Sequence, residues 1–382
     1  MKFFHVSDLH IGKRIGNYST NLIEDQTDVL TKIVALAKEE QPDAILIAGD
    51  VYDKPMPTIE AVQLLDRFLV WLNELGISIF LISGNHDSIE RMAFGAELMK
   101  SSNVHIVQTY NGEMQPAVVS DAHGEVQVWM LPHLRPSSVR KHHPNTNINS
   151  CSDAVAAALG NAVINTNKRN VLVAHQFVTG SITCDSEEIV VGDSENVDAA
   201  LFDAFDYVAL GHIHRPQHIK RETLRYSGTP LMYSLSEADH TKSVTVVEME
   251  SKGKITISEL PLELPRVIRE VRGTYEELMS RANYRDTNID DLVHIVLTNE
   301  QEEPDAIAKL RNVYPHILNL RYDNQRTQAV YAFETSPTTA QRTPVDLFSD
   351  FFENQHGGRK LSAEQSEYVS AVFGELKEAM LS

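Results

Sequence analysis

The amino-acid sequence predicts an α/β fold, because short apolar runs typical of strands alternate with helical patterns along its first half. The predicted helix over Ile59–Leu75 has apolar residues three and four positions apart, and it is followed by Gly76, a common helix stop. Its expected buried residues are Val62, Leu65, Phe68, Leu69 and Leu72. The first predicted elements are the strand Phe3–Val6, a helix over 22–37, the strand Ala44–Ile47, a helix over Ile59–Leu75 and the strand Ile77–Ile82.

Apolar runs continue through the middle of the chain and give way to a second α/β pattern. Repeated Pro and Leu residues around Leu260–Pro265 mark the connection. Thr274-Tyr-Glu-Glu277 has the form of a capping box, which predicts a helix start there. We therefore expect a small separate α/β domain after the connection. The further predicted strands are Val126–Leu131, Val171–Ala174, Tyr207–Leu210, Ser243–Glu248, Val267–Val271, Leu292–Leu297 and Ile317–Tyr322, with helices from Thr274 and over Asp305–Val313.

Two helices are predicted at the C-terminal end, over Pro344–Glu353 and Ser362–Met380, after the polar stretch Thr335–Arg342. An apolar helix that follows a polar linker has no obvious core of its own. These helices therefore either bind a partner or cover the core of the preceding domain. The resulting division of the chain is 1–262, 263–336 and 337–382.

The bulk composition argues against several classes of protein. No apolar run approaches the roughly 18 residues that span a bilayer. Residues 1–6 lack the pattern of a signal peptide, so we expect a cytoplasmic protein. The two cysteines, Cys151 and Cys184, are too few for a disulfide framework. A net charge of −19 argues against a broad basic face for nucleic acid. If DNA is the substrate, metals, local basic clusters or a partner must supply the attraction.

Five short polar motifs follow one another along the chain, and each begins directly after an apolar strand-like run. Ligands in open α/β sheets gather beyond the carboxyl ends of the strands, so residues distant in sequence can meet there. Gly49, Gly84 and Gly211 permit tight turns at these positions. One pocket can therefore collect all five motifs. They are Asp8-Leu-His10, Gly49-Asp50-Val-Tyr-Asp53, Gly84-Asn85-His86-Asp87, His175 in Ala174-His-Gln, and Gly211-His212-Ile-His214.

Together the motifs offer carboxylate, amide and imidazole ligands for two divalent metal ions, provided that Asp50 bridges them. Two ions about 3.5–4 Å apart can drive an in-line phosphoryl displacement. His86 is left over and can donate a proton to the departing oxygen, with Asp87 nearby to fix its orientation. The ligand types suit Mn, Mg, Fe or Zn. We expect one ion on Asp8, His10, Asp50 and His214, and the other on Asp50, Asn85, His175 and His212.

Each motif is weak when it stands alone. Asp-x-His and Gly-Asp are usually capping or turn residues, and Gly-His-x-His also suits a single zinc site. An isolated His175 is more typical of a core than of a metal site. The shared order and strand-end position of the motifs favour the two-metal interpretation. His133 is expected in a surface or structural role, and the basic residues Arg135, Arg140 and Lys141 are more typical of a solvated loop than of a phosphate contact.

The motif set resembles that of the calcineurin-like metallophosphoesterases. Within that superfamily the chain is similar to the SbcD family of bacterial nuclease subunits that act in DNA double-strand-break repair. The narrower similarity rests on the opening Phe4–Gly12, on Tyr226–Leu231, and on Glu237 and Lys242. It spans essentially the whole chain.

The resemblance implies a nuclease domain over 1–262 built as a β-sandwich flanked by helices, a DNA-facing capping domain over 263–336, and C-terminal helices over 337–382 that bind an SbcC-like ATPase subunit. It implies two metal ions, usually manganese, and a homodimer within a heterotetramer. The implied activity is exonuclease action on duplex ends and endonuclease action on single strands or hairpins. Asp53 departs from the pattern, since some relatives have His there, and we expect a structural role for it.

Two other interpretations stay open. A stand-alone metallophosphoesterase for a small phosphoester would use the same metal site, although the C-terminal hundred or so residues argue against it. A scaffold that keeps the fold without catalysis should lack one or more ligands or His86, and this chain lacks none.

Overall fold

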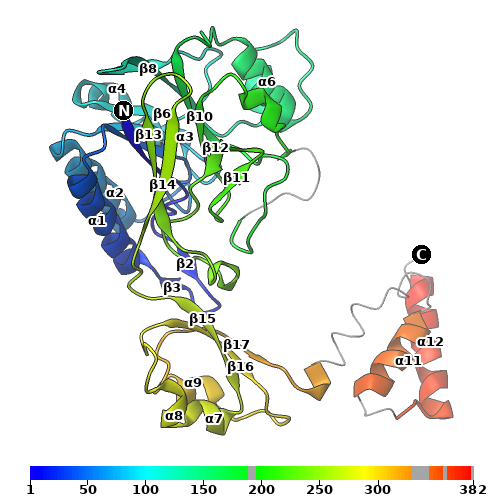
Figure 1. Ribbon diagram of the computed structural model, residues 1–382. Helices are drawn as coiled ribbons and strands as arrows, with labels where there is room; N and C mark the ends of the chain where they lie inside the picture. Colours follow the sequence, from blue (N-terminus) through cyan, green and yellow to red (C-terminus); the bar gives the residue numbers. More distant parts are fainter. Residues whose placement is uncertain (188–194, 328–343, 356–358, 380–382) are drawn as a thin grey trace. The chain divides into compact units, whose positions relative to one another are not determined.

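The structure, a computed structural model, describes residues 1–187, 195–327, 344–355 and 359–379 of the chain (Figure 1). Two compact units cover Met1–Arg269 and Glu270–Ser382. The predicted polar stretch Thr335–Arg342 and the last residue of the predicted C-terminal helix, Met380, lie outside the described residues. The three-part division at residues 262 and 336 stays a prediction.

Unit 1 is a sandwich of two six-stranded sheets with orders β14-β13-β1-β4-β5-β6 and β11-β12-β10-β9-β8-β7. Side chains from the inner faces, among them Leu46, Phe80, Val171 and Tyr207, form one fully buried core. The predicted β-sandwich is thereby confirmed. The first sheet comprises β14 (Ile255–Pro261), β13 (Ser243–Met249), β1 (Lys2–Val6), β4 (Ala44–Ala48), β5 (Ser78–Ile82) and β6 (Val104–Val107). The second comprises β11 (Gln217–Ile219), β12 (Arg221–Tyr226), β10 (Tyr207–Gly211), β9 (Arg169–His175), β8 (Gly124–Leu131) and β7 (Ala117–Asp121).

Two long helices lie against the first sheet. Helix α1 (Ile23–Glu40) packs along α2 (Ile59–Glu74) (Figure 1). Helix α2 also contacts β5. Side chains alternate along each strand, so in β4 Leu46 faces the sandwich core while Ile45 and Ile47, equally buried, lie on the opposite face. A strand buried on both faces explains why this run is apolar throughout.

The buried face of α2 differs from the one predicted. Ala61, Leu64, Leu65, Phe68 and Leu72 are buried, whereas Val62 is exposed and Leu69 is only partly buried. Ala61 and Val62 are about 100° apart around a helix, so only one of them can lie at the centre of the apolar stripe. The smaller Ala61 occupies it.

Helix α6 (Cys151–Gly160) covers the outer face of the second sheet. It begins with a capping box between Ser150 and Asp153. Its buried side chains join those of the sheet and of the short turn Ala199–Phe202 in a second core, which includes Trp129 and Leu172. The short elements of unit 1 are β2 (Arg14–Ile15), β3 (Thr20–Asn21), α3 (Ile89–Ala93), α4 (Ala96–Met99) and α5 (Pro136–Arg140).

The central strands of each sheet are parallel, which determines where the polar motifs meet. In the first sheet β1, β4, β5 and β6 run parallel, and in the second β8, β9, β10 and β12 do. Asp8, Asp50 and Asn85 follow β1, β4 and β5, while His175 ends β9 and His212 follows β10. Loops at the carboxyl ends of both sheets therefore bring these side chains to one edge of the sandwich.

Unit 2 contains the three-stranded sheet β15-β16-β17 and short helices, followed by α11 and α12. The capping box predicted at Thr274 and Glu277 is confirmed. None of the described helices combines the length and apolar character that crossing a membrane requires. The elements are β15 (Ile268–Gly273), α7 (Tyr275–Met279), α8 (Arg281–Tyr284), β16 (Leu292–Leu297), α9 (Ala306–Leu310), β17 (Ile317–Tyr322), α11 (Pro344–Gln355) and α12 (Ala363–Ala379).

Candidate metal centre

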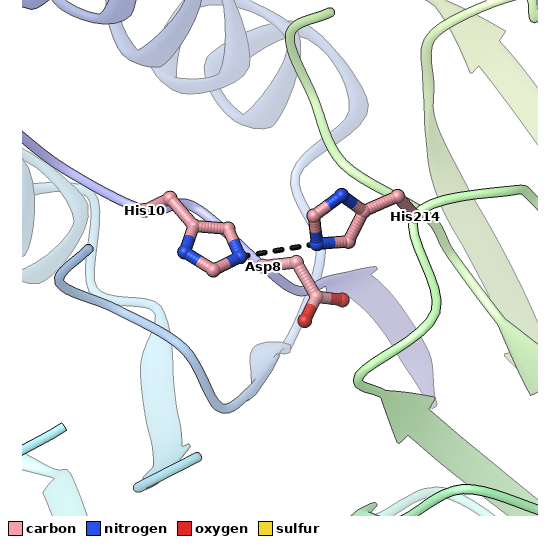
Figure 2. Close-up of side chains that lie close together, drawn as sticks. All are labelled: Asp8, His10 and His214. Carbon is pink, nitrogen blue, oxygen red and sulfur yellow. Dashed lines mark hydrogen bonds between the residues drawn. The ribbon is translucent and has the colours of Figure 1, made fainter. Parts of the chain in front are cut away.

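Asp8, His10 and His214 form a first buried cluster, although His10 and His214 are 204 positions apart in sequence (Figure 2). The Nε2 atoms of the two imidazoles face each other at 3.1 Å. One ligand atom from each of the three residues lies within 4.8 Å of the others. A cation placed among them would meet two nitrogens and a carboxylate.

Asn85, His175 and His212 form a second cluster. The Oδ1 atom of Asn85 lies 2.9 Å from His175 Nε2 and 2.9 Å from His212 Nδ1. Asn85 follows β5 of the first sheet, and the two histidines come from β9 and the end of β10 in the second. Both sheets thus contribute to each cluster.

Asp50 lies between the two clusters. Its Oδ2 atom is 3.4 Å from His175 Nε2 and 3.7 Å from His10 Nε2. Its Oδ1 atom accepts a hydrogen bond from the backbone N–H of His86 at 3.0 Å. One carboxylate oxygen therefore faces a nitrogen of each cluster, as expected of a bridging ligand. The structure brings together all seven side chains that we predicted as metal ligands.

Hydrogen bonds on the far side of two imidazoles determine which nitrogen is left to bind a cation. His175 Nδ1 lies 2.8 Å from the carbonyl oxygen of Ala48, which can only accept, so Nδ1 carries the proton. His214 Nδ1 lies 2.6 Å from the Ser186 hydroxyl, which itself donates to Glu237 at 2.6 Å. His214 therefore donates through Nδ1 as well. Such outer partners orient histidines that bind metals through Nε2.

Burial determines the charge of side chains in both clusters. Burial lowers the pKa of His10, His212 and His214, so these rings are neutral and hold free lone pairs. Burial also raises the pKa of the Asp8 carboxyl to about 8, because its ionised form has lost contact with water. Each neutral ring keeps one nitrogen lone pair that a cation can use, and the Nε2 atoms of His10 and His214 lie within hydrogen-bond distance of each other at 3.1 Å. The donor set thus fits a bound cation.

His175 behaves differently from the other three imidazoles. Burial alone would lower its pKa, but the carboxylates of Asp50 and Asp8 outweigh burial and raise the pKa of His175 to about 9. The two carboxylates therefore favour a positive charge at His175, which a bound metal cation would also supply. Nitrogen and oxygen donors without a thiolate suit divalent ions of the Mn, Mg, Fe and Zn group.

Four of the seven side chains come from residues with left-handed backbone. The φ angles are 54° at Asp8, 44° at His10, 48° at Asp50 and 102° at His212. Such non-glycine conformations cost of order 1–3 kcal/mol each and persist only where the surrounding structure imposes them. This strain turns the ligand side chains toward a common point, and its concentration here is typical of a functional site.

Two glycines allow the ligand loops to approach one another. A Cβ atom on Gly84 would lie 2.0 Å from Asp50 Oδ1, and one on Gly211 would lie 1.8 Å from the carbonyl oxygen of Ala48. Any larger residue would therefore force the backbone apart at these two points. The expected role of Gly84 and Gly211 in closely packed turns agrees with this geometry.

His86 and Asp87 lie in the same turn but have different partners. His86 Nδ1 lies 2.9 Å from the carbonyl oxygen of Asp53, and its Nε2 is 3.9 Å from Asp50 Oδ2, so the ring points into the site. Asp87 instead accepts hydrogen bonds from the backbone N–H groups of Gly84, Val51 and Tyr52. We expected Asp87 to orient His86, but the carbonyl oxygen of Asp53 is the group that contacts the His86 ring. Asp87 instead connects the loop of Gly84 to the loop of Val51 and Tyr52.

The comparisons with known proteins agree with this geometry. A family model described as calcineurin-like phosphoesterase matches residues 1–216, and one described as type 5 capsule protein repressor C-terminal domain matches residues 265–356. The SbcD component of the nuclease SbcCD from Staphylococcus epidermidis is 35% identical over 380 residues, which are 98% of this chain and 98% of that protein. The corresponding protein of Staphylococcus saprophyticus is 32% identical, with 99% of each chain covered.

This chain belongs to the SbcD family of calcineurin-like phosphoesterases. Among solved structures, a dimetal phosphatase from Danio rerio covers 68% of this chain and 96% of its own, with 13% identity and a TM-score of 0.42.

In this SbcD family member, a buried ion pair stands behind the first cluster. Glu237 and Lys242 are inaccessible to solvent and 2.5 Å apart. Burial alone would raise the pKa of Glu237, but the Lys242 ammonium lowers it well below its usual range. Glu237 also accepts from Ser186, which holds His214. Sequence patterns gave Ser186 no role, because its contact with His214 depends on the tertiary fold.

His133 is the other site residue that sequence reasoning assigned elsewhere. Its ring lies 6.4 Å from that of His212, nearly parallel to it, and 6.1 Å from that of His175. Burial lowers its pKa to about 3, so the ring is neutral. The available signal was its position shortly after β8, because β8 lies beside β9 in the sheet and β9 ends at the predicted ligand His175.

Asp53, for which we expected a structural role, lies beside the first cluster. Its carboxylate pairs with Lys13 at 2.8 Å and lies 3.7 Å from His10 Nδ1. This arrangement places Asp53 behind the first cluster rather than within it.

Proposed function

We propose that this chain cleaves DNA with two divalent metal ions, as the nuclease subunit of an SbcCD-type complex. The convergence of seven oxygen and nitrogen donors on two adjacent positions, with Asp50 between them, carries the proposal. Two such ions lower the barrier to phosphodiester cleavage by stabilising both the attacking and the leaving oxygen. Asp8, His10 and His214 would hold one ion, and Asn85, His175 and His212 the other.

Manganese is the ion that we propose for both positions. Magnesium prefers oxygen ligands and retains water, whereas this set contains four imidazoles. Zinc and iron remain chemically compatible, because no thiolate is present among the predicted ligands to discriminate between them. The resemblance of the motif set to manganese nucleases favours Mn²⁺.

His86 acts on the leaving oxygen in this proposal. The Asp53 carbonyl holds its Nδ1, so Nε2 is directed toward Asp50 and the centre of the site. A protonated ring donates from Nε2 to the departing oxygen while the Asp53 carbonyl continues to accept from Nδ1. Asp87 is a positioning residue, since it ties the loop of His86 to the loop of Asp50.

DNA is the proposed substrate, as duplex ends for exonuclease action and as single strands or hairpins for endonuclease action. The relatives carry the name of the nuclease SbcCD, and they match this chain over nearly its full length. That extent favours an SbcC-like ATPase partner over the stand-alone small-phosphoester enzyme. A partner also supplies positive charge that a chain of net charge −19 lacks. The relatives are bacterial proteins, so the proposed place of action is the cytoplasm of a bacterium.

The C-terminal helices are the proposed docking segment for the ATPase. Helices α11 and α12 contact each other, and their rings Phe348 and Phe373 lie 6.3 Å apart. Tyr368 is 72% exposed and Val372 is 38% exposed, so apolar side chains remain open to solvent on α12. Exposed apolar surface of this kind is typical of a partner interface.

A homodimer within a heterotetramer is the proposed assembly. Phe94 and Leu98, in the region of α3 and α4, are 85% and 80% exposed, and Met56 is 76% exposed. Large apolar side chains in water destabilise a free surface, and a second copy of this chain would cover them.

The decisive experiment compares cleavage of linear duplex and single-stranded DNA by the Mn²⁺-loaded protein, alone and with its ATPase partner, for wild type and His86→Ala. His86→Ala should reduce DNA cleavage about 10²–10⁴-fold, the usual contribution of a general acid. The matched control is His123→Ala, an exposed histidine in the turn between β7 and β8, which should retain full activity.

Failure to cleave DNA, while bis-p-nitrophenyl phosphate is still hydrolysed, would favour a small-substrate phosphoesterase. Equal loss in the His86 and His123 variants would remove the proton-donor assignment.

A further inference from the structure

A cavity of about 380 Å³ opens beside the second cluster of the metal centre. Gly84 and the predicted metal ligand Asn85 line one part of it, next to His133. Tyr110, Ile89 and Arg135 line further parts. The cavity therefore starts at the metal centre and extends away from it, and the cleavage chemistry described above makes no use of it.

Hydrogen bonds between three loops hold the cavity open. The backbone N–H of His133 donates to the carbonyl oxygen of Ser83 at 3.1 Å. The backbone N–H of Ser83 donates to the carbonyl oxygen of Val107 at 3.2 Å. The Ser83 hydroxyl donates to the carbonyl oxygen of Gln108 at 2.7 Å. The loops that follow β5, β6 and β8 are thus fixed to one another, so the cavity is preformed.

One wall is aromatic and held in place. The Tyr110 ring is buried, and its hydroxyl contacts His143 Nε2 at 2.7 Å and the carbonyl oxygen of Gly112 at 2.9 Å. The His133 ring lies nearly parallel to that of His212. The Tyr110 ring stacks on His143 and so fixes this wall, while the His133 ring lines the cavity and provides the aromatic surface that suits contact with a nucleobase.

Arg135 provides the positive charge of the cavity. Within the part of the chain that the structure describes, no carboxylate forms an ion pair with its side chain. Two carboxylates also line the cavity, but Asp87 is bound to three backbone N–H groups and Glu90 accepts from the Ser88 hydroxyl. Arg135 is thus available to a phosphate.

We propose that this cavity is a nucleoside subsite of the nuclease. It receives the base and sugar of one unpaired nucleotide next to the scissile phosphate, and Arg135 holds the phosphate beyond that nucleotide. This inference rests on the proposed DNA cleavage. The volume lies at the lower end of the roughly 300–1,000 Å³ of small-molecule sites, so it suits a single nucleotide rather than a base pair. Cleavage should then favour ends that fray or single strands, since the base must leave its stack.

The test compares Arg135→Gln with Arg140→Gln. Arg135 directly precedes helix α5, and Arg140 is an exposed arginine at the end of that helix, outside the cavity. Cleavage of a single-stranded oligonucleotide and hydrolysis of bis-p-nitrophenyl phosphate are measured with Mn²⁺-loaded full-length protein. Arg135→Gln should lower the ratio of the two kcat/KM values about tenfold, mainly through a higher KM for DNA, because a charge-assisted contact is lost. Arg140→Gln should leave the ratio unchanged.

A second variant tests the base directly. Ser137 is exposed and lines the cavity, so Ser137→Trp should fill part of it. In the wild-type protein, deoxyadenosine monophosphate should inhibit bis-p-nitrophenyl phosphate hydrolysis about tenfold more strongly than deoxyribose 5-phosphate, as stacking of one base predicts. Ser137→Trp should remove that difference.

Equal inhibition by the two phosphates in the wild type, or equal ratios in the two arginine variants, would overturn the subsite while leaving DNA cleavage intact. Loss of all DNA cleavage in the wild type, with bis-p-nitrophenyl phosphate still hydrolysed, would instead overturn the proposed function and the subsite with it.

Discussion

At the scale of single residues, side chains behind the ligands control how the ligands point. Glu237 connects the buried Lys242 ammonium to Ser186 and so to His214. Glu237→Gln keeps the shape but leaves Lys242 without a counter-charge. We expect a loss of about 3–5 kcal/mol in unfolding free energy, as is usual when one partner of a buried pair is removed. We also expect about 10–100-fold weaker Mn²⁺ binding, because His214 loses its orienting chain. Urea denaturation and calorimetric titration measure the two effects.

The matched control for Glu237 is Glu259→Gln. Glu259 pairs with Arg225 at a partly exposed position, where such pairs contribute about 0–1 kcal/mol. This variant should bind Mn²⁺ as the wild type does. A Glu237 variant that loses stability but keeps wild-type Mn²⁺ affinity would show that the pair supports only the fold.

Sequence patterns could identify the predicted ligands because each one follows a strand-like run, and parallel strands of a sheet end at one edge. The same reasoning could not find Ser186 or His133, whose site contacts depend on the packing of distant loops. It also placed Asp87 beside His86 on the basis of adjacency, although adjacent side chains in this turn point to different partners.

At the scale of elements, close contact between strand ends is the feature most sensitive to change. Gly211 ends β10, where a Cβ atom would lie 1.8 Å from the Ala48 carbonyl oxygen and 2.8 Å from His175 Nδ1. Gly211→Ala should therefore displace the loop that carries His212 and His214. We expect about 1–3 kcal/mol of destabilisation from overpacking. Thermal unfolding and Mn²⁺ titration should both register the change.

Gly160→Ala is the matched control for this element. Gly160 is the last residue of α6, and a Cβ atom there would meet no atom within 4 Å. Alanine in a helix is about 0.5–1 kcal/mol more favourable than glycine, so this variant should be as stable as the wild type or more so. Wild-type Mn²⁺ affinity in Gly211→Ala would mean that the loop tolerates the added methyl group, contrary to the close packing at β10.

Helices and strands were predictable where the spacing of apolar residues agreed with the turn residues at the ends of the element. Strands β16 and β17 are examples, since their bounds match the predicted strands. The buried face of α2 was not predictable from the sequence. Ala61 and Val62 are adjacent, and hydrophobicity alone favours the larger residue at the buried position. Packing space against the sheet decides between them, and that space is a property of the tertiary structure.

At the scale of the whole molecule, the metal centre lies entirely within one of two units. All seven predicted ligands belong to Met1–Arg269, and Glu270–Ser382 has a separate core that includes Val293, Leu310 and Tyr314. A ligand that binds only the folded form stabilises the unit that binds it. Metal binding should therefore affect the two units unequally.

Calorimetric unfolding of the full-length chain, with and without Mn²⁺, tests this expectation. At a free concentration about 100 times its dissociation constant, Mn²⁺ should add about 2.7 kcal/mol to the unfolding free energy of unit 1. The Tm of the unit 1 transition should then rise by several degrees. The Tm of the unit 2 transition should not change on addition of Mn²⁺. Asp50→Ala removes the carboxylate between the two clusters, so its unit 1 transition should no longer respond to Mn²⁺. A shift that persists in Asp50→Ala would place the bound ions elsewhere, and equal shifts of both transitions would mean that the units unfold together.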